Sequence, residues 1–422
     1  MPRTSGSAND KTDVTIIGAG IVGICCALSL LEKGLSVRLI DKGEPGQATS
    51  YGNAGVISPW SCVPQSMPGL WRDIPGWLFD PNGPVAVRWR YLPKLLPWTL
   101  KFLRAGRADQ VARIADAMAA LNRPNVDLYR HHLAGTGHEA LVGHSWYIYA
   151  HRKAADANLD TLGWRLRIKH GAPVERVGGE ELRAIEPALS PDFKAGILMK
   201  DQARALLPGR LGQVLADKAR SMGAKVDRLA VSRIEPNPEG GWRLQTEQGS
   251  EDAAILVIAT GPWSTQLLKP LGINLPLEYE RGYHMEFHEP GLTISNSIMD
   301  VDRKFVTSAM ENGIRSAGTA EFGGLDAPPD MRRAQILKNL TKQMLPGLNT
   351  ENTSEWSGVR PSFPDSLPCI GKLPGYENLF AAFGHSHYGL GMAPGTGRLV
   401  ADLVTGTTPN VDVSPYKAER FL

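Results

Sequence analysis

Three glycines near the start of the 422-residue chain have the spacing of a dinucleotide-binding fingerprint. In DVTIIGAGIVG, Gly18 turns the chain from a strand into a helix, Gly20 lets a pyrophosphate approach the backbone, and Gly23 lets helix and strand pack closely. Asp41 follows at roughly the 20-residue spacing of an acid that hydrogen-bonds a ribose. Because its carboxylate would repel a 2′-phosphate, the pattern favours FAD or NAD over NADP. The alternative is a glycine-rich turn in an unrelated βαβ unit.

Apolar segments of the right length would position these residues. Residues 14–17 have the pattern of a buried strand, 21–33 that of a helix, and 36–41 that of a second strand. A further apolar run, 255–259, reads as a strand that ends in a turn. This order of elements predicts an α/β fold built on a Rossmann-like unit.

Five motifs follow one another along the chain: GAGIVG, SYGNAG, ATG at 259–261, GVRPSFPDSLPCIG at 358–371 and GHSHYGLGMAPGTGRLVADLVTG at 384–406. In this order they resemble the D-amino-acid oxidase superfamily of FAD enzymes, and most closely its D-amino-acid dehydrogenase branch. The resemblance spans nearly the whole chain. It implies FAD as the cofactor, with non-covalent binding expected.

The same resemblance implies how the fold is divided. A discontinuous Rossmann-like FAD-binding domain is expected at 12–60, 200–270 and 350–410, preceded by a disordered leader at 1–11. An α+β substrate-binding domain with an antiparallel sheet is expected between these segments, at 61–199 and 271–349.

Cofactor contacts are expected from every FAD-binding segment. The residues that the resemblance implies for FAD binding are Gly18, Ala19, Gly20, Ile21, Val22, Gly23, Asp41, Lys42, Thr49, Ser50, Asn53, Ala54, Gly55, Val231, Ala259, Thr260, Gly261, Gly384, His387, Gly389, Leu390, Gly391 and Met392. Gly389 and Gly391 would open a helix whose N–H groups face the N1 and C2 carbonyl edge of the flavin and stabilise negative charge there. The alternative is a glycine-rich turn in front of an amphipathic helix.

Four residues are candidates for the substrate side. Arg360, in GVRPSFPD, matches the family position that holds the substrate carboxylate, which a planar guanidinium can bind with two hydrogen bonds. Residues 281–287 read as a strand beside the substrate, with Tyr283 and His284 on opposite faces and either one a candidate pocket residue. His387 stands where some glycine-oxidising relatives carry arginine, which argues against a glycine oxidase.

Two histidine patterns are possible metal sites. One is His385 with His387, and the other is His284, Glu286 and His288 on one strand face. Polar residues that share a strand face are usually solvated, and the glycines around the C-terminal histidines suit a flavin loop. We therefore predict no metal ion.

The resemblance implies oxidative deamination of a D-amino acid, or of a D-proline-type cyclic amino acid. Hydride would pass from Cα to flavin N5, and electrons would pass to a quinone or another acceptor. No side-chain base is obligatory for that reaction. Three alternatives stay open: an oxygen-using amino-acid, sarcosine or glycine oxidase, a non-catalytic flavin-binding protein, and an NAD-linked dehydrogenase.

Composition excludes several other classes. With 46 basic and 43 acidic side chains interspersed, a nucleic-acid partner is not expected. The four cysteines have no CxxC spacing, which indicates a reducing compartment without a disulfide framework. No apolar run approaches the ~18 residues of a membrane span, so a cytoplasmic location is expected.

Residues 60–107 have a different composition from the rest of the chain. They hold Trp60, Trp71, Trp77, Trp89 and Trp98, interleaved with arginines and lysines. One interpretation, which we favour slightly, is a folded insert whose tryptophans belong to a core. The other is a peripheral contact with the inner face of the membrane, where amphipathic rings and cations both find partners.

Overall fold

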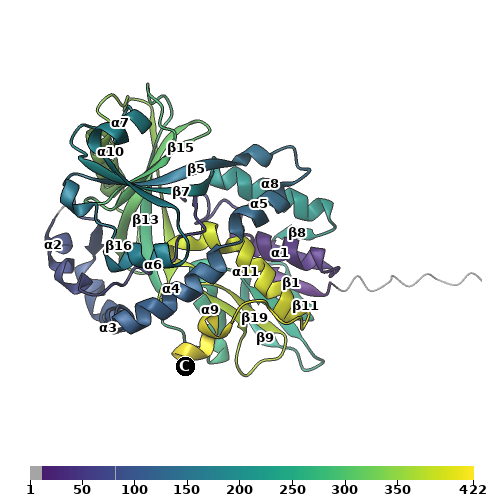
Figure 1. Cartoon of the computed structure of the whole chain (residues 1–422). Coiled ribbons are helices and arrows are strands. Elements are labelled where there is room, and N and C mark those ends of the chain that lie inside the picture. Colours follow the sequence, from purple (N-terminus) through teal and green to yellow (C-terminus); the bar gives the residue numbers. More distant parts are fainter. Residues whose placement is uncertain (1–11, 81) are drawn as a thin grey trace, which may run out of the picture.

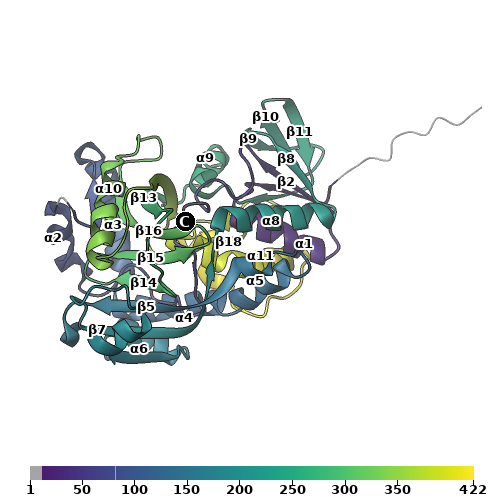
Figure 2. The same cartoon turned by 90° about the horizontal axis from the view of Figure 1, so that it is seen from above.

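The computed structural model describes residues 12–80 and 82–422, and it contains two large β-sheets (Figures 1 and 2). The leader expected at 1–11 lies outside the described residues. In the six-stranded sheet the order is β18 (Cys369–Lys372), β19 (Leu379–Phe383), β12 (Ile255–Ile258), β1 (Val14–Ile17), β2 (Val37–Asp41) and β8 (Lys225–Arg228). All neighbours are parallel except β18 and β19. The expected Rossmann-like unit is confirmed.

Helices around this sheet hold its distant segments together. They are α1 (Ile21–Glu32), α4 (Ala108–Asn122), α5 (Asn125–Leu133), α8 (Pro208–Ser221), α9 (Ser264–Leu268) and α11 (Gly389–Val404). A Cβ on Gly397 would overlap the carbonyl of Cys25, and one on Gly395 would lie 2.7 Å from the carbonyl oxygen of Leu121. Gly397 therefore allows α11 to pack tightly against α1, and Gly395 allows it to pack tightly against α4.

The larger sheet has ten strands and is mostly antiparallel. Its main path is β17 (Thr353–Ser362), β13 (Glu278–Phe287), β16 (Gly313–Phe322), β15 (Phe305–Met310), β14 (Ser297–Asp300), β5 (Val142–His151), β7 (Ala195–Ala205) and β3 (Val56–Ile57). The strand β4 (Val85–Val87) pairs with β16, and β6 (Val174–Gly178) pairs with β7. The part of the molecule built on this sheet also contains the helices α6 (Leu162–Lys169), α7 (Gly179–Ile185) and α10 (Arg332–Met344). A separate sheet contains β9 (Val231–Pro236), β10 (Trp242–Thr246) and β11 (Gly249–Ala253).

The larger sheet takes in strands from segments that were expected in the FAD-binding domain. The segment expected to return to the FAD-binding domain at 350 begins with β17, which pairs with β13 along its whole length, from Glu278 opposite Ser362 to Phe287 opposite Thr353. The strand β7 crosses the expected limit at 200, and β3, which ends before the expected limit at 60, pairs with β7 in the larger sheet. Backbone hydrogen bonding assigns these strands to the larger sheet, and their pairing cannot be read from local composition.

The described residues of 60–107 contain β4 and several helices, including α2 (Ile74–Phe79) and α3 (Leu92–Ala105), at one side of the ten-stranded sheet (Figure 1). Of the five tryptophans only Trp98 is buried, whereas Trp71 is 59% exposed and Trp89 is 76% exposed. The interpretation of these rings as a core holds for Trp98 and fails for Trp71 and Trp89. No helix in the described residues is long and apolar enough to cross a membrane.

Candidate active site

A cavity of about 1130 Å³ lies where the carboxyl ends of the six-stranded sheet meet the larger sheet. Its wall includes the ends of β1, β2, β12 and β19 on one side, and residues of β13, β16 and β17 on the other. The carboxyl edge of a parallel sheet is where doubly wound folds bind ligands.

Each fingerprint glycine has a separate structural reason. Gly18 has φ +111°, and a Cβ there would overlap the carbonyl of Ala259. A Cβ on Gly23 would overlap the carbonyl of Gly18, so Gly23 allows α1 to lie against β1. A Cβ on Gly20 would meet only Ser50 Oγ, at 3.5 Å. Packing within the described chain therefore does not explain the glycine at position 20. Open space beside this residue leaves room for a pyrophosphate to approach the backbone.

Two helices begin on the cavity wall. The helix α1 starts after Gly20, and α11 starts at Gly389. The N-cap residues Gly20 and Tyr388 make no side-chain capping bond, although the N–H of Ile21 donates to Ser50 Oγ at 3.1 Å, and Cβ atoms on Gly389 or Gly391 would meet nothing closer than 3.6 Å. The remaining N–H groups and the positive ends of the two helix dipoles suit a phosphate at one terminus and an electron-rich ring edge at the other.

The carboxylate of Asp41 is fixed at the end of β2. Its Oδ2 accepts a hydrogen bond from the N–H of Ala19 at 2.7 Å, and its Oδ1 accepts one from the N–H of Gly43 at 2.9 Å. Asp41 and the neighbouring Lys42 both line the cavity. A carboxylate held in this way keeps acceptor capacity for a ribose hydroxyl.

Most of the predicted cofactor residues lie on the cavity wall. These are Gly18, Gly20, Ile21, Val22, Asp41, Lys42, Thr49, Ser50, Asn53, Ala54, Val231, Ala259, Thr260, Gly261, Gly384, His387, Gly389, Leu390 and Gly391.

Four of the predicted cofactor residues do not line the cavity. Ala19 supplies an N–H to Asp41, Gly23 packs α1 onto β1, and Met392 is buried in the core. Gly55 has φ +84° and turns the chain toward β7. These four support the wall from behind, since packing and backbone geometry rather than a ligand account for them.

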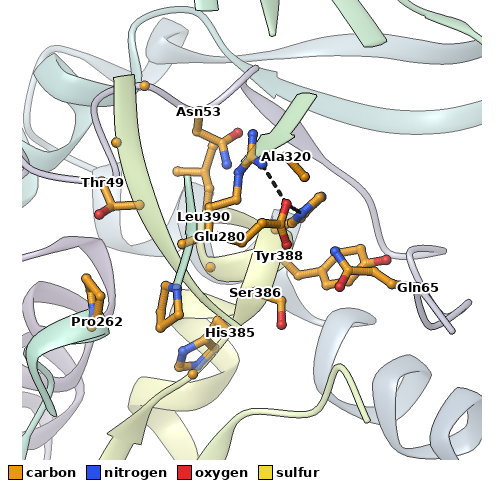
Figure 3. A pocket seen from close by; sticks show the side chains of 18 of the residues that line it. Thr49, Asn53, Gln65, Pro262, Glu280, Ala320, His385, Ser386, Tyr388 and Leu390 are labelled. Atoms are coloured by element: carbon orange, nitrogen blue, oxygen red, sulfur yellow. Dashed lines mark hydrogen bonds and ion pairs between the residues drawn. The ribbon is translucent and has the colours of Figure 1, made fainter. Parts of the chain in front are cut away.

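On the opposite wall, three charged or titratable side chains meet. Glu280 on β13 lies opposite Arg360 on β17 in the strand register. The Nη1 of Arg360 donates to Glu280 Oε1 at 2.8 Å and to the carbonyl of Thr319 at 3.0 Å. His387, on the turn Ser386–Tyr388 before α11, hydrogen-bonds the same carboxylate oxygen through Nε2. Figure 3 marks the contacts of Glu280 within the pocket with dashed lines.

Glu280 stays ionised although its side chain is only 4% exposed. Burial by itself would raise the pKa of this carboxyl, but His387 and Arg360 outweigh that effect and lower the pKa to about 2. Oε2 also accepts a hydrogen bond from Ser362 Oγ at 3.2 Å. A buried carboxylate is a stable arrangement only when it is paired and hydrogen-bonded in this way.

The structure separates the two candidates on the strand 281–287. Tyr283 lines the cavity, and its hydroxyl hydrogen-bonds Glu321 and accepts from the N–H of Asp330 at 2.8 Å. His284 does not line the cavity. Its ring stacks on Trp356, and its Nδ1 lies 3.2 Å from the carbonyl oxygen of Gly52. The alternation of a strand places His284 on the other face, so its predicted place on the pocket wall is wrong.

Neither histidine pattern gathers as a metal site in the structure. His288 hydrogen-bonds Ser354, and His385 hydrogen-bonds Thr396, so each pattern is divided among separate protein partners. Within the described ranges, Glu32, His131 and His132 are the one group of three such side chains with ligand atoms close together, and they lie outside the cavity.

Sequence reasoning missed Glu280 completely. Its role depends on the register that sets β13 against β17, and one sequence carries no marker for that pairing. Gly282 is the nearest available signal, because a Cβ there would overlap the guanidinium of Arg360. Arg360 itself lies on the cavity wall where the resemblance implies it.

The fold and the cavity are those of a dinucleotide-dependent oxidoreductase, with a separate polar cluster on the opposite wall. The family model described as FAD dependent oxidoreductase, DAO, matches residues 13–403. The chain belongs to this family, and FAD is its cofactor.

Named relatives agree with this assignment. The chain is 39% identical over 416 residues to a D-amino-acid oxidase of Bradyrhizobium diazoefficiens, covering 97% of this chain and 99% of the relative. It is 30% identical over 424 residues to a D-amino acid dehydrogenase of the same organism, covering 97% and 98%. The crystal structure of glycine oxidase from Geobacillus kaustophilus shares the fold, with a TM-score of 0.74 at 22% identity, covering 98% of this chain and 99% of that one.

Proposed function

We propose that this protein oxidises a D-amino acid at Cα, forming an imino acid that water hydrolyses to a 2-oxo acid. The observation that carries the proposal is Arg360, a guanidinium on the cavity wall that is 18% exposed. Two relatives named for D-amino acids, at 39% and 30% identity over almost the whole chain, support the substrate class.

Arg360 binds the substrate carboxylate. Its two hydrogen bonds within the described residues both leave from Nη1, so Nε and Nη2 remain as donors. Gly282 gives the guanidinium room to lie against β13. Bound FAD supplies the acceptor for the hydride from Cα.

The wall beside this cluster is apolar and excludes water. Leu95, Trp98 and Phe102 of α3 line the cavity, and Trp98 Nε1 donates to the carbonyl of Ser362 at 3.1 Å. A dry wall strengthens the charged hydrogen bonds to the carboxylate and leaves space for an apolar substrate side chain.

We also propose that a quinone accepts the electrons and that the described residues of 60–107 meet an anionic lipid surface. Leu92, Leu96 and Leu100 recur every four residues along α3 and are 53–60% exposed, so they form one apolar stripe. Residues 82–107 contain arginine and lysine but no acidic residue. Because Leu92 and Leu96 also line the cavity, the stripe is continuous with its mouth.

Oxygen is the second candidate for the acceptor. The relative at 39% identity is named an oxidase, whereas the relative at 30% identity is named a dehydrogenase. Purified enzyme with substrate decides between them: hydrogen peroxide formed at the rate of substrate consumption identifies oxygen, and turnover only with an artificial quinone identifies the dehydrogenase.

Anaerobic bleaching of the bound flavin tests the substrate class. D-alanine, D-phenylalanine and D-proline should reduce the visible absorbance, and their L-enantiomers should not. Arg360→Lys should lower kcat/KM by about 10²-fold, because one ammonium cannot replace a planar fork. Arg332→Lys, on a side chain that is 88% exposed, is the matched control. A yellow protein that no amino acid bleaches would overturn the proposal.

A further inference from the structure

His387 presents its two ring nitrogens to different surroundings. Nε2 hydrogen-bonds Glu280 Oε1, whose side chain is 4% exposed, while the His387 side chain is 41% exposed and lines the cavity. In the described part of the chain, Nδ1 has no hydrogen-bond partner and is not among the buried polar atoms. The imidazole is therefore anchored at one nitrogen and open to the cavity at the other.

Glu280 fixes which nitrogen carries the proton. The carboxylate is ionised, since the neighbouring His387 and Arg360 outweigh burial and lower its pKa to about 2. An ionised carboxylate only accepts hydrogen bonds, so Nε2 must be the protonated nitrogen. In the neutral ring Nδ1 then holds a lone pair, as in other carboxylate–histidine pairs that act as bases.

The same carboxylate oxygen of Glu280 also holds two protein side chains, Arg360 and His387, close to each other. Arg360 Nη1 and His387 Nε2 both hydrogen-bond Oε1 of Glu280, so the guanidinium and the imidazole lie side by side. An α-amino acid carries its carboxylate and its amine on one carbon. A substrate whose carboxylate is bound by Arg360 would thus bring its amine close to His387.

We propose that Glu280 and His387 form a dyad in which His387 Nδ1 removes a proton from the substrate ammonium group. This rests on the proposed oxidation of an amino acid. The N–H bond breaks, the proton moves to Nδ1, and the electron pair stays on the amine nitrogen. The neutral amine would then support the loss of hydride from Cα, for which bound FAD would be the acceptor, and it would become a protonated imino group. Glu280 stabilises the imidazolium and is a positioning residue.

The charged and titratable neighbours of His387 are few. Glu280 faces it from β13, and Arg360 approaches the same carboxylate from β17. Tyr388 lies on the same turn, with its ring 6.4 Å from the imidazole, and burial raises the pKa of its hydroxyl, so it stays neutral. The charge of Arg167, on α6, lowers the pKa of the Tyr388 hydroxyl, but burial has the larger effect. Glu280 is therefore the one anion in direct contact with the imidazole among the described residues.

The pH dependence of flavin reduction by D-phenylalanine tests the dyad. The wild-type rate should have a plateau around neutral pH, because the enzyme deprotonates the ammonium itself. In His387→Gln only free amine can react, so the rate should rise about tenfold per pH unit and fall roughly 10²-fold below wild type at pH 7. Glu280→Gln should show the same rising profile.

Two controls separate a base from a packing residue. His288→Gln makes the same replacement on an exposed histidine that hydrogen-bonds Ser354, and it should keep the plateau. Binding of benzoate, a carboxylate with no amine, is read from the flavin spectrum and should be unchanged in His387→Gln.

Each outcome decides something. A plateau retained in His387→Gln overturns the dyad, and so does an equal loss at every pH together with weaker benzoate binding. If wild type is reduced by no amino acid in the panel, the proposed function fails with its dyad, whereas a reduced wild type with an unchanged variant profile removes the dyad alone.

Discussion

The two sides of the cavity are built from different parts of the polypeptide. On the cofactor side the backbone forms much of the site, through glycine turns and the N-termini of two helices. On the substrate side, side chains form the site, and Glu280, Arg360 and His387 come from three separate elements. Sequence spacing therefore records the first side, whereas strand register and chain packing create the second.

The largest effect is expected from substitutions of two fingerprint glycines, Gly23, which allows helix and strand to pack, and Gly20, which leaves room for the cofactor. Gly23→Ala places a Cβ against the carbonyl of Gly18, so the free energy of unfolding should fall by about 2 kcal/mol or more. In Gly20→Ala the new Cβ meets only Ser50 Oγ at 3.5 Å, so stability without FAD should change by about 1 kcal/mol or less. Its FAD affinity should nevertheless fall by about tenfold or more.

Urea unfolding of the apoprotein and titration with FAD measure these two effects. Equal loss of stability in both variants would show that the glycine at position 20 is required by the fold. That result would contradict the division between packing and ligand approach.

A smaller effect is expected on the outer surface of the substrate side. Replacing Phe79 and Trp89, which are 87% and 76% exposed, by serine should weaken binding to phosphatidylglycerol vesicles by about tenfold or more. Cosedimentation gives the bound fraction. Ile168→Ser, at an exposed apolar residue outside this segment, is the control. Binding that does not change, or that is equal on neutral vesicles, would contradict the proposed lipid contact.

The last prediction concerns a buried histidine beside the cofactor side, whose effect at neutral pH is small and grows only as the pH falls. Burial lowers the pKa of His385 to about 3 from its usual 6.5, so the unfolded chain binds a proton that the folded chain refuses between these values. Stability contributed by neutral His385 is present above pH 6.5 and is lost as pH falls toward 3. The slope is at most about 1.4 kcal/mol per pH unit.

His385→Gln keeps a partner for Thr396 and removes this titration. Urea unfolding between pH 7 and 4 should show a shallower loss of stability than in wild type. A slope would remain, because burial and Arg315 also lower the pKa of His284 to about 3. An unchanged slope would mean that His385 is not held neutral in the fold.

The fold of the cofactor side could be predicted because its signals are local. The turn at Gly18, the helix after it and the acid at the end of β2 lie within 30 residues of one another, and each follows from backbone geometry. That β19 returns to the same sheet agrees with the resemblance to a family, which assigned residues 350–410 to the FAD-binding domain.

Local signals were weaker for the substrate side. Residues 281–287 were correctly predicted as a strand, yet which of Tyr283 and His284 faced the cavity stayed open until the neighbouring strands were known. The tryptophans of 60–107 were given two interpretations, because an aromatic ring is compatible with a core and with a surface.

The sequence by itself determined the dinucleotide-binding unit, its choice against NADP, and the presence of an arginine suited to a carboxylate. Only the tertiary structure decided that Arg360 shares Glu280 with His387, that His284 lies behind the wall, and that Trp89 is exposed. The physical reason is that glycine turns and helix starts are fixed by neighbours along the chain. Charge pairing and burial depend on strands and helices that meet only when the whole chain has folded.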